Sequence, residues 1–405
     1  MKQQGFFSVK ETQSDNRPDG KTYSCASCGL IKECKTPRMK PFGNFKKRIL
    51  IVGEIPSEMD DQRGKQWQCT NGRFLQKELK EIGIDLVEDC ASINAINCYT
   101  SKDVGSYQIA CCRKSVLKII KDLQPRIIVL FGFWAVQSVI GSRWKKDLDD
   151  IEKWRGWVIP DQDFKARIIP LYHPAVIANA NKEWQTVWRL DLQLIKEALG
   201  TPFPEYIEPV IDIIEDLTPL TKIPDGSTIA FDYETTGLKP HAVGHRIICA
   251  SVADTKDHAF VFMMPKSKDE RDPFVDILRN KTIKKIAQNM KFEEAWSLVR
   301  LRQTVRNWFW DTMLATHIFD NRSGVSGLKF QVYVQFGIID YSSEIAPFLM
   351  AKDNKDGNAI NQIEELIKTK EGRRKLMIYC GYDSVYEYRL ALLQMNRMSI
   401  DILPF

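Results

Sequence analysis

The chain has 405 residues, of which 44% are hydrophobic, 27% charged and 10% aromatic. This composition is ordinary for a globular protein, so disordered, collagen-like and coiled-coil chains are excluded, and the length suffices for two or three domains. The longest apolar runs, such as residues 126–137, are far shorter than the roughly 20 residues of a membrane-spanning helix, and the first residues show no signal-peptide pattern. We therefore expect a soluble, cytoplasmic protein with no membrane partner.

Charge is distributed unevenly along the chain. Residues 1–200 contain 32 Lys and Arg against 24 Asp and Glu, whereas residues 201–405 contain 26 against 28. Between Lys21 and Arg48 there are eight basic residues, and only Glu33 opposes them. A local excess of this kind favours contact with the phosphate backbone of a nucleic acid, although a solvated surface is the alternative interpretation.

The first half of the chain alternates between strands and helices. Apolar segments at residues 48–54, 91–96, 126–132 and 166–173 are separated or followed by helical patterns at 71–83, 107–123, 133–141 and 181–199. Strands that are apolar throughout and are connected by helices predict a parallel sheet covered on both faces. We therefore predict a three-layer α/β domain over residues 23–200, preceded by an irregular tail over residues 1–22.

A proline-containing segment, "GTPFPEYIEP", follows the last of these helices, and we predict a linker over residues 201–222. The second domain is predicted over residues 223–405. It begins with strands at 227–237, 246–254 and 258–264 and then becomes mainly helical.

Acidic residues in the second domain have the spacing of a metal site. Asp232 and Glu234 lie two apart on a predicted strand, so both carboxylates project from one face. Glu293 begins a predicted helix, and Tyr379 and Asp383 lie one turn apart on another. Carboxylates are ligands for two Mg²⁺ or Mn²⁺ ions about 4 Å apart, which activate water against a phosphodiester. Tyr379 is expected to orient that water.

These segments resemble the three motifs of the DEDDy 3'-5' proofreading exonucleases attached to family A DNA polymerases. The motifs are "FDYET", "QNMKFE" and "YCGYD", and "WDTMLA" from Trp310 resembles a segment between the second and third. The resemblance covers about residues 223–400 and implies a ribonuclease-H-like fold. It also implies that Asp232, Glu234 and Asp383 hold two ions and that Asn289 contacts the substrate. Glu293 stands where the family has Asp.

Cysteine is concentrated in the first domain. Eight of the ten cysteines fall at or before Cys112, and Cys25 and Cys28 form a CxxC pair. In a chain with no export signal, this clustering favours metal binding or buried thiols over disulfides. Four thiolates from separated segments suit either zinc or a [4Fe-4S] cluster, and their spacing leaves both open.

The first domain resembles the family 4 uracil-DNA glycosylases over about residues 22–199. The matching segments are "VGEIP", residues 64–72, "INAINC" and "YHPAVI". The resemblance implies a [4Fe-4S] cluster on Cys25, Cys28, Cys98 and Cys112, with Cys34 and Cys111 as spare thiols. Ile55 and Ser57 replace small residues of the family loop, and the arginine-bearing wedge after the His-Pro motif is absent.

The same resemblance assigns roles in base excision, in which a base is extruded, stacked and read along its edge. Trp67 would stack on the base, and Asn94 would pair with the N3-H and O4 of uracil, which cytosine cannot satisfy. His173 would stabilise negative charge on the departing base. Glu54 would position water or stabilise the sugar cation.

The two modules, in this order, resemble the N-terminal part of certain bacteriophage DNA polymerases. The leading prediction is a metal-dependent 3'-5' exonuclease that acts on single-stranded 3' ends of DNA and has a glycosylase-like DNA-binding domain. Because no polymerase motifs follow, we expect either a stand-alone or split subunit, with a separate DNA polymerase chain as partner, or a part of a larger polymerase. One alternative is a uracil-DNA glycosylase of base-excision repair with an accessory nuclease domain. The other is a non-catalytic subunit that binds DNA and docks on a polymerase.

Overall fold

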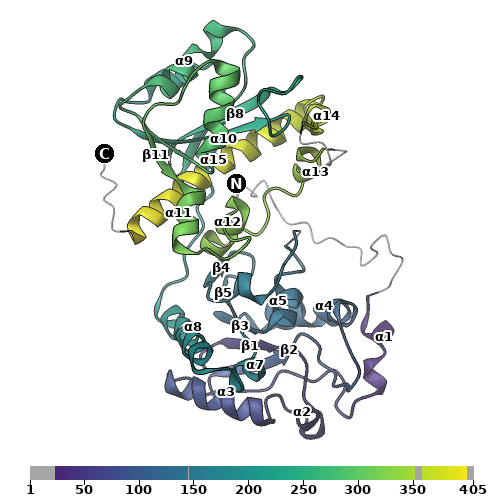
Figure 1. Cartoon of the computed structure of the whole chain (residues 1–405). Coiled ribbons are helices and arrows are strands. Elements are labelled where there is room, and N and C mark those ends of the chain that lie inside the picture. The colour runs from purple at the N-terminus through teal and green to yellow at the C-terminus, as the bar shows by residue number, and fades with distance from the viewer. Residues whose placement is uncertain (1–22, 145, 352–357, 399–405) are drawn as a thin grey trace, which may run out of the picture. The chain divides into compact units, whose positions relative to one another are not determined.

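The computed structural model describes residues 23–144, 146–351 and 358–398 (Figure 1). The tail predicted over residues 1–22 lies outside the described residues. The chain divides into two compact units. The first unit comprises Met1–Tyr206 with Tyr333–Asp340, and the second comprises Ile207–Val332 with Tyr341–Phe405.

The first unit is built on a five-stranded sheet with the order β2-β1-β3-β5-β4. Its strands are β1 (Ile49–Gly53), β2 (Cys90–Asn94), β3 (Ile127–Phe131), β4 (Ile159–Asp161) and β5 (Ala166–Leu171). All pairs are parallel except β4 with β5, an antiparallel edge that the apolar pattern did not predict. The helices are α1 (Cys25–Cys28), η1 (Leu30–Lys32), α2 (Glu58–Arg63), α3 (Thr70–Glu81), α4 (Ser106–Leu123), α5 (Phe133–Val139), α6 (Ile151–Trp154), α7 (Pro174–Ala178) and α8 (Lys182–Gly200).

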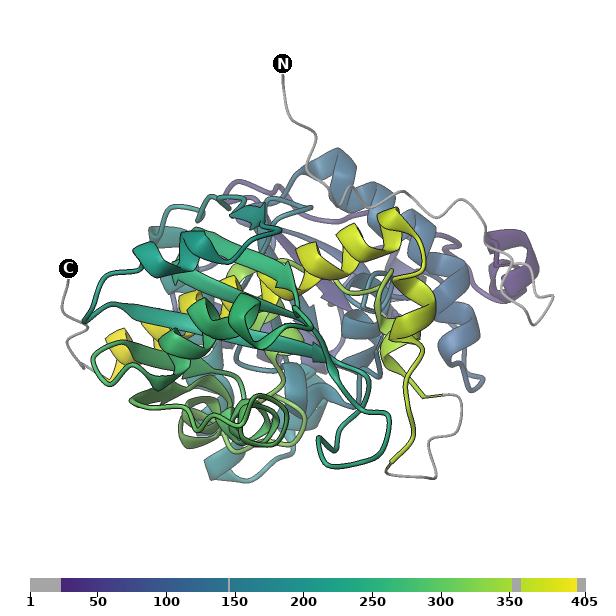
Figure 2. The ribbon, with the colours of Figure 1, turned by 90° about the horizontal axis from the view of Figure 1, so that it is seen from above.

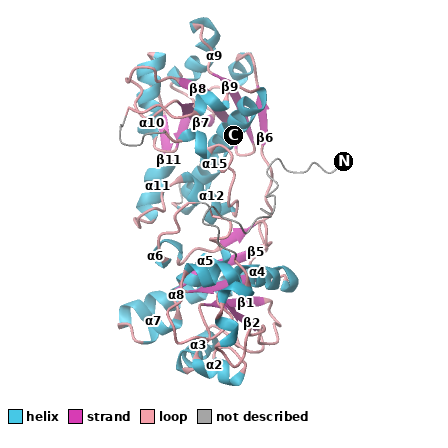
Figure 3. Ribbon diagram, turned by 90° about the vertical axis from the view of Figure 1, so that its right-hand side faces the viewer, coloured by secondary structure: helices cyan, strands magenta, loops and turns pink. Residues whose placement is uncertain are grey.

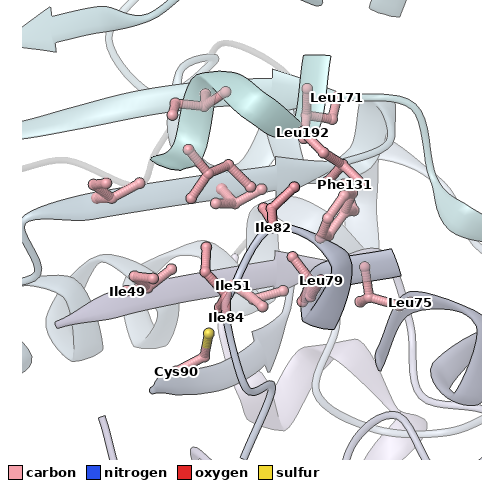
Figure 4. Packing of buried hydrophobic residues seen from close by; sticks show 14 of the residues in the cluster. Ile49, Ile51, Leu75, Leu79, Ile82, Ile84, Cys90, Phe131, Leu171 and Leu192 are labelled. Atoms are coloured by element: carbon pink, nitrogen blue, oxygen red, sulfur yellow. The ribbon is translucent and has the colours of Figure 1, made fainter. Parts of the chain in front are cut away.

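Both faces of this sheet are covered. Ile49 and Ile51 of β1 pack with Leu75 and Leu79 of α3 and with Leu192 of α8 (Figure 4). The alternate residues of β1 point to the opposite face and are also fully buried, and α5 packs against β1 and β3 there. The sheet is therefore the middle of three layers, as predicted, and Figure 3 shows helices flanking its strands.

The second unit contains a six-stranded sheet with the order β11-β10-β7-β8-β9-β6. Its strands are β6 (Val210–Ile213), β7 (Thr228–Thr235), β8 (Ile247–Thr255), β9 (His258–Met263), β10 (Lys284–Ala287) and β11 (Trp308–Asp311). β7–β8 and β8–β9 are antiparallel, and the other pairs are parallel. Its helical segments, including α12 at the unit boundary, are η2 (Thr218–Lys222), α9 (Lys268–Arg279), α10 (Met290–Trp296), η3 (Ser297–Leu301), α11 (Thr312–Phe319), α12 (Leu328–Phe336), α13 (Ala346–Leu349), α14 (Ile363–Leu366) and α15 (Lys370–Arg397).

The two faces of the second sheet carry side chains of different size. On one face, Phe231 and Tyr233 of β7 pack with Phe274 of α9 and Trp296 of α10. On the other face, small residues such as Ala230 of β7 lie against Val385 of α15. Small side chains let a helix approach closely, and Figure 2 shows α15 in yellow running alongside this sheet.

The segment expected to be a linker, residues 201–222, contains regular structure. Val210–Ile213 form β6, which pairs in parallel with β9, and Thr218–Lys222 form η2. The mainly exposed side chains of β6 gave no apolar pattern by which this edge strand could be predicted.

None of the helices in residues 23–144, 146–351 and 358–398 has the length and hydropathy that crossing a bilayer requires.

Candidate functional site

The centre of the second unit is the face of β7 that meets α15. Asp232 and Glu234 occupy alternate positions on β7, as predicted, and lie near Cys380 of α15. One ligand atom from each of the three side chains lies within 4.8 Å of the others. Ser251, which faces Asp232 on β8, donates a hydrogen bond to the carbonyl of Cys380 at 2.8 Å, so sheet and helix are joined at this point.

Asp383, one helical turn beyond Tyr379 on α15, also belongs to this site. Its Oδ1 accepts a hydrogen bond from the Tyr341 hydroxyl at 2.6 Å and forms an ion pair with Lys329. The Lys329 ammonium also lies 4.5 Å from the ring centre of Tyr341 and 4.3 Å from that of Tyr379. A cation over two aromatic rings is favourable, so Lys329 fixes both tyrosines beside Asp383.

Tyr379 is buried, and the environment keeps its hydroxyl neutral. Burial raises the pKa of Tyr379 well above its usual value, and repulsion from Asp383 and Glu234 raises it further. Its ring lies 6.0 Å from that of Tyr341. Interaction with the Asp383 carboxylate also raises this pKa, so the hydroxyl keeps its proton.

Glu293 reaches the site from the first turn of α10. It is 2% exposed, and its Oε2 has no hydrogen-bond partner among the residues that the structure describes. Burial raises the pKa of Glu293 well above its usual value, and the charges of Asp232 and Asp311 add to this shift. The structure therefore places this carboxylate near Asp232, as the motif order predicts.

Asp311 positions the loop before α10. Its carboxylate accepts backbone hydrogen bonds from Asn289 at 3.1 Å and Met290 at 3.0 Å, and it also caps α11. Asn289 has a φ of 67°, in the left-handed region that asparagine tolerates better than most residues. The backbone of Asn289 thus helps to set where α10 begins and, with it, the position of Glu293.

The environment of these acids disfavours negative charge. Burial raises the pKa of both Asp232 and Glu234 well above their usual values. The next largest cause is repulsion, which Asp383 exerts on Asp232 and Asp232 exerts on Glu234. Glu387, which the sequence analysis did not select, shows the same shift for the same reason. Buried carboxylates that repel one another are a donor set suited to hard divalent cations.

Carboxylate oxygens that lack a hydrogen-bond partner indicate whether divalent cations fit this site. Glu293 Oε2 and Glu387 Oε2 are both buried without a hydrogen-bond partner. Lys329 is the cation that lowers the pKa of Asp232, Glu234 and Glu387, and it is already paired with Asp383. The residues therefore fit divalent metal ions, and Asp232, Glu234 and Asp383 are those that would hold them.

Sequence reasoning missed four contributors to this site: Lys329, Tyr341, Asp311 and Glu387. Glu387 follows Asp383 by the same four-residue step that separates Asp383 from Tyr379, and this spacing was a usable signal. Lys329 and Tyr341 lie 54 and 42 residues from Asp383, so no local pattern connects them.

The first unit brings its predicted thiol ligands together. Burial is the main reason that the pKa of Cys112 is raised to about 12. The charges of Cys28, Cys98 and Cys25 raise it further, so these three thiols act on Cys112. Cys111 acts on Cys28 in the same way, and Cys98 contributes to raising the pKa of Cys34 to about 11, after the main effect of burial. Both spare thiols therefore lie beside the predicted set.

Hydrogen-bond donors surround these sulfurs. The backbone N–H of Arg38 donates to Cys98 Sγ at 3.2 Å, and the Arg38 side chain donates to Cys25 Sγ at 2.9 Å. N–H donors of this kind stabilise thiolate ligands of a cluster. The four thiols thus fit a metal cluster, whose binding would offset their mutual repulsion.

The predicted base-binding residues also meet. Asn94 ends β2 opposite Gly53, and a Cβ on Gly53 would lie 2.5 Å from Asn94 Oδ1 and 3.1 Å from the Trp67 ring. The Trp67 ring stacks on His173 with 5.7 Å between ring centres. Trp67 has a φ of 62°, and a Cβ on Gly72 would lie 2.0 Å from its carbonyl oxygen, so glycine is required there.

His173 is held in a defined tautomer. Its Nδ1 accepts the backbone N–H of Ala175 at 3.2 Å, which places the ring proton on Nε2. Burial lowers the pKa of His173 to about 4, so the imidazole is neutral near pH 7. A neutral ring that donates from Nε2 suits the role expected for His173 against a base oxygen.

Glu54 has partners other than the expected water or sugar. Its Oε1 accepts the backbone N–H of Trp134 at 3.2 Å, at the start of α5. Burial raises the pKa of Glu54, while the backbone N–H groups of Trp134 and Phe133 lower it. The structure therefore shows Glu54 capping α5.

Two families match the chain in succession. Residues 40–193 match the uracil DNA glycosylase superfamily, and residues 210–390 match a 3'-5' exonuclease family. The type-4 uracil-DNA glycosylase of Archaeoglobus fulgidus is 27% identical over 192 residues, which is 45% of this chain and 91% of that protein. The type-4 enzyme of Saccharolobus solfataricus is 29% identical over 183 residues, covering 44% and 82% respectively.

A third relative covers both halves. The DNA polymerase of Bacillus phage SP01 is 23% identical over 329 residues, which is 72% of this chain and 34% of the polymerase. The chain thus spans about a third of that relative. Together with the fold, these matches confirm both resemblances: the chain joins a uracil-DNA-glycosylase-like domain to a 3'-5' exonuclease domain.

Proposed function

We propose that the second unit removes nucleotides from single-stranded 3' ends of DNA, using two Mg²⁺ or Mn²⁺ ions. The observation that carries this proposal is the convergence of Asp232 and Glu234 from β7 with α15, where ligand atoms of three side chains lie within 4.8 Å. Asp383 and Glu293 complete a set of carboxylates around that point. The exonuclease family match over the same residues supports the reaction type.

Asp232, Glu234 and Asp383 are proposed to hold the ions. When bound, the ions supply Lewis acidity for the attacking water and for the leaving oxygen. Tyr379, whose hydroxyl is kept neutral and held at Asp383, is proposed to orient the water. Water adds to the terminal phosphorus, the bond to the 3' oxygen of the preceding nucleotide breaks, and that oxygen takes up a proton through solvent.

Asn289 is proposed to contact the terminal nucleotide. It immediately precedes α10, its backbone is fixed by Asp311, and Glu293 follows one helical turn later. A DNA 3' end bound near this turn would approach the site from the side on which Glu293 lies.

The first unit is proposed to bind DNA with a [4Fe-4S] cluster on Cys25, Cys28, Cys98 and Cys112. The basic segment that begins after α1 is tied to the domain by Asp61, which accepts the backbone N–H groups of Lys35 at 2.8 Å and Thr36 at 2.7 Å. A fixed basic segment loses less conformational freedom when it binds a phosphate backbone.

Uracil excision is the second candidate function. The neutral His173 with its proton on Nε2, near Asn94 and Trp67, favours it. However, the Trp67 ring rests on His173 itself, and its Nε1 is buried without a partner. A base could therefore reach His173 only after Trp67 moves, so we rank excision below nuclease activity.

We also infer that the nuclease serves a DNA polymerase. Similarity to the phage polymerase extends over 72% of this chain and so includes both domains. A primer with a mismatched 3' end tests this inference. The chain should restore extension of this primer by an exonuclease-deficient polymerase of the same family. Failure to restore primer extension would contradict the inference that a DNA polymerase is the partner.

One assay separates the two candidate functions. DNA strands labelled at the 5' end, with and without an internal uracil, are incubated with the full chain in Mg²⁺ or in chelator. We expect a ladder of shortened strands that requires Mg²⁺ and is independent of uracil. Alkali-sensitive breakage at uracil in chelator would show excision, and strands that stay intact in Mg²⁺ would contradict the nuclease.

A further inference from the structure

Glu387 is a buried acid with no role in the proposed chemistry so far. It lies on α15 and is 1% exposed, and its Oε2 is buried without a hydrogen-bond partner. A buried carboxylate normally has a partner, because desolvation of an unpaired charge is costly. Among residues 23–144, 146–351 and 358–398 no group satisfies that oxygen, so a bound cation is a candidate partner.

The position of Glu387 directs it toward the metal centre. It follows Asp383 by one helical turn, and Asp383 follows Tyr379 by one turn, so the three side chains share one face of α15. This is the face that meets β7, because Cys380, which lies on the same side of the helix as Glu387, contacts Asp232. Burial raises the pKa of Glu387, and repulsion from Asp232, Glu293 and Asp383 raises it further, which agrees with this position.

Glu293 has the same unsatisfied chemistry. Its Oε2 is also buried without a partner, and it too is repelled by Asp232. Lys329, the cation that acts on Glu387, already forms an ion pair with Asp383. Two carboxylate oxygens that Asp232 repels therefore have no hydrogen-bond partner among the described residues.

We propose that Glu387 is a further ligand of the metal centre and that it shares one of the two divalent cations with Asp232. This inference rests on the proposed function and deepens it. The five carboxylates at 232, 234, 293, 383 and 387, with the one ammonium of Lys329, leave a formal charge of −4, which two divalent cations neutralise.

Metal binding measured without DNA tests the proposal. Electron paramagnetic resonance of free Mn²⁺ counts the ions bound to the full chain. Glu387→Gln, which keeps the shape but removes the charge, should bind one Mn²⁺ at least tenfold more weakly than the wild type. Glu371→Gln is the matched control, because Glu371 is an exposed acid on the same helix that pairs with Lys375. Unchanged binding of both ions by Glu387→Gln would overturn the proposal.

Thermal unfolding excludes a merely structural role. Without metal, Glu387→Gln should melt at or above the wild-type temperature, because a repelled carboxylate has been removed. Its rise in melting temperature on adding Mn²⁺ should be smaller than that of the wild type. If Glu387→Gln does not fold, Glu387→Asp replaces it, with intermediate Mn²⁺ affinity expected and wild-type affinity contradicting the proposal.

Nuclease assays in parallel separate this inference from the proposed function. A wild type that binds two Mn²⁺ ions, with Glu387→Gln weakened, but that leaves DNA intact would refute the function and keep the metal ligand. A wild type that degrades DNA, with Glu387→Gln binding both ions normally, would refute only the ligand.

Discussion

Single carboxylates in this chain differ in what surrounds them. Glu88 on the surface pairs with Lys46, and hydrogen bonds from Lys46 and Asn44 lower its pKa. Glu234 is buried among other acids, so its pKa is raised. Glu88 is stabilised as an anion by Lys46 and Asn44, whereas the buried Glu234 needs a cation to become charged. Buried carboxylates with raised pKa values occur more often at catalytic or metal-binding sites than at sites that only stabilise the fold.

We expect Asp232→Ala and Asp383→Ala each to lower exonuclease activity by about a hundredfold or more, because the ions supply several kcal/mol of transition-state stabilisation. Asp232 lies within the 4.8 Å ligand group, and Asp383, which is proposed to bind metal, also interacts with Tyr379. Release of labelled nucleotide under single-turnover conditions measures the effect.

The control for these variants is Asp269→Ala, which removes an exposed acid at the start of α9. All three proteins should give circular dichroism spectra like that of the wild type. Full Mg²⁺-dependent digestion by either site variant would show that the metal centre lies elsewhere.

At the scale of elements, the sequence predicted those that carry strong periodicity. Trp188, Leu192 and Ile195 recur on one face of α8, and the apolar strands of the first sheet are buried on both faces. β4 and β6 escaped prediction because β4 has three residues and β6 exposes most of its side chains. Their positions depend on tertiary pairing with β5 and β9, which no local pattern encodes.

The candidate sites show the same division. Motif spacing predicted that Asp232, Glu234, Tyr379 and Asp383 lie on one strand and one helix, and the structure has them there. The pairing of Lys329 with Asp383 and the stacking of Trp67 on His173 arise from segments that are distant in sequence. Only the folded structure shows that Lys329 places a cation beside Asp383 and that Trp67 covers the ring of His173.

The short helix α1 should depend on the proposed cluster. Cys28→Ser removes one of four ligands, so we expect the variant to lose the roughly four irons per chain that a [4Fe-4S] cluster brings. DNA binding should weaken more than digestion of short strands slows, because the cluster orders the basic segment that follows α1. Iron and acid-labile sulfide, measured after anaerobic purification, check the first expectation.

Cys69→Ser is the matched control, since Cys69 precedes α3 and is not among the gathered thiols. It should keep its iron. Stoichiometric zinc without sulfide in the wild type would refute the cluster, and wild-type metal content in Cys98→Ser would refute the ligand set.

The edge strand β6 should loosen as pH rises. Burial lowers the pKa of His258, but hydrogen bonds to Asp254 and Asp212 outweigh burial and raise it above its usual 6.5. The protonated ring joins β9 to Asp212 of β6, so this contribution is fully present below pH 6.5 and is lost as pH rises through the raised pKa. It should amount to less than about 1 kcal/mol, because the Asp212 side chain is largely exposed.

Hydrogen-exchange protection of the amides in Val210–Ile213, corrected for the intrinsic rate, measures this effect at pH 6 and pH 8.5. Asp212→Asn should remove most of the pH dependence. Glu215→Gln, which changes a nearby exposed acid, should leave it unchanged. Equal pH dependence in all three proteins would show that His258 does not hold the strand.

At the scale of the whole molecule, two chemistries are proposed on two units. The carboxylates and Tyr379 lie in the second unit, whereas Asn94, Trp67 and His173 lie in the first. The segment Tyr333–Asp340 belongs to the first unit although its neighbours in sequence belong to the second. The units are therefore linked by more than one passage of the chain, but each has its own sheet and core.

Asn94→Ala and His173→Ala should consequently lower any uracil release without changing the exonuclease. Asn94 would lose its pairing with the base edge, and His173 would lose the hydrogen bond that stabilises the departing base. Alkali-sensitive breakage in chelator and strand shortening in Mg²⁺ report the two reactions separately. Parallel losses in both assays would indicate one shared active site.

The ion pair between Lys329 and Asp383 has a consequence for how the centre is filled. An ammonium group already lies at Asp383 and over the rings of Tyr341 and Tyr379. It holds both tyrosines beside that carboxylate without a metal ion. A divalent ion bound by Asp383 would therefore compete with Lys329 for that carboxylate, whereas an ion bound by Asp232 and Glu234 would not.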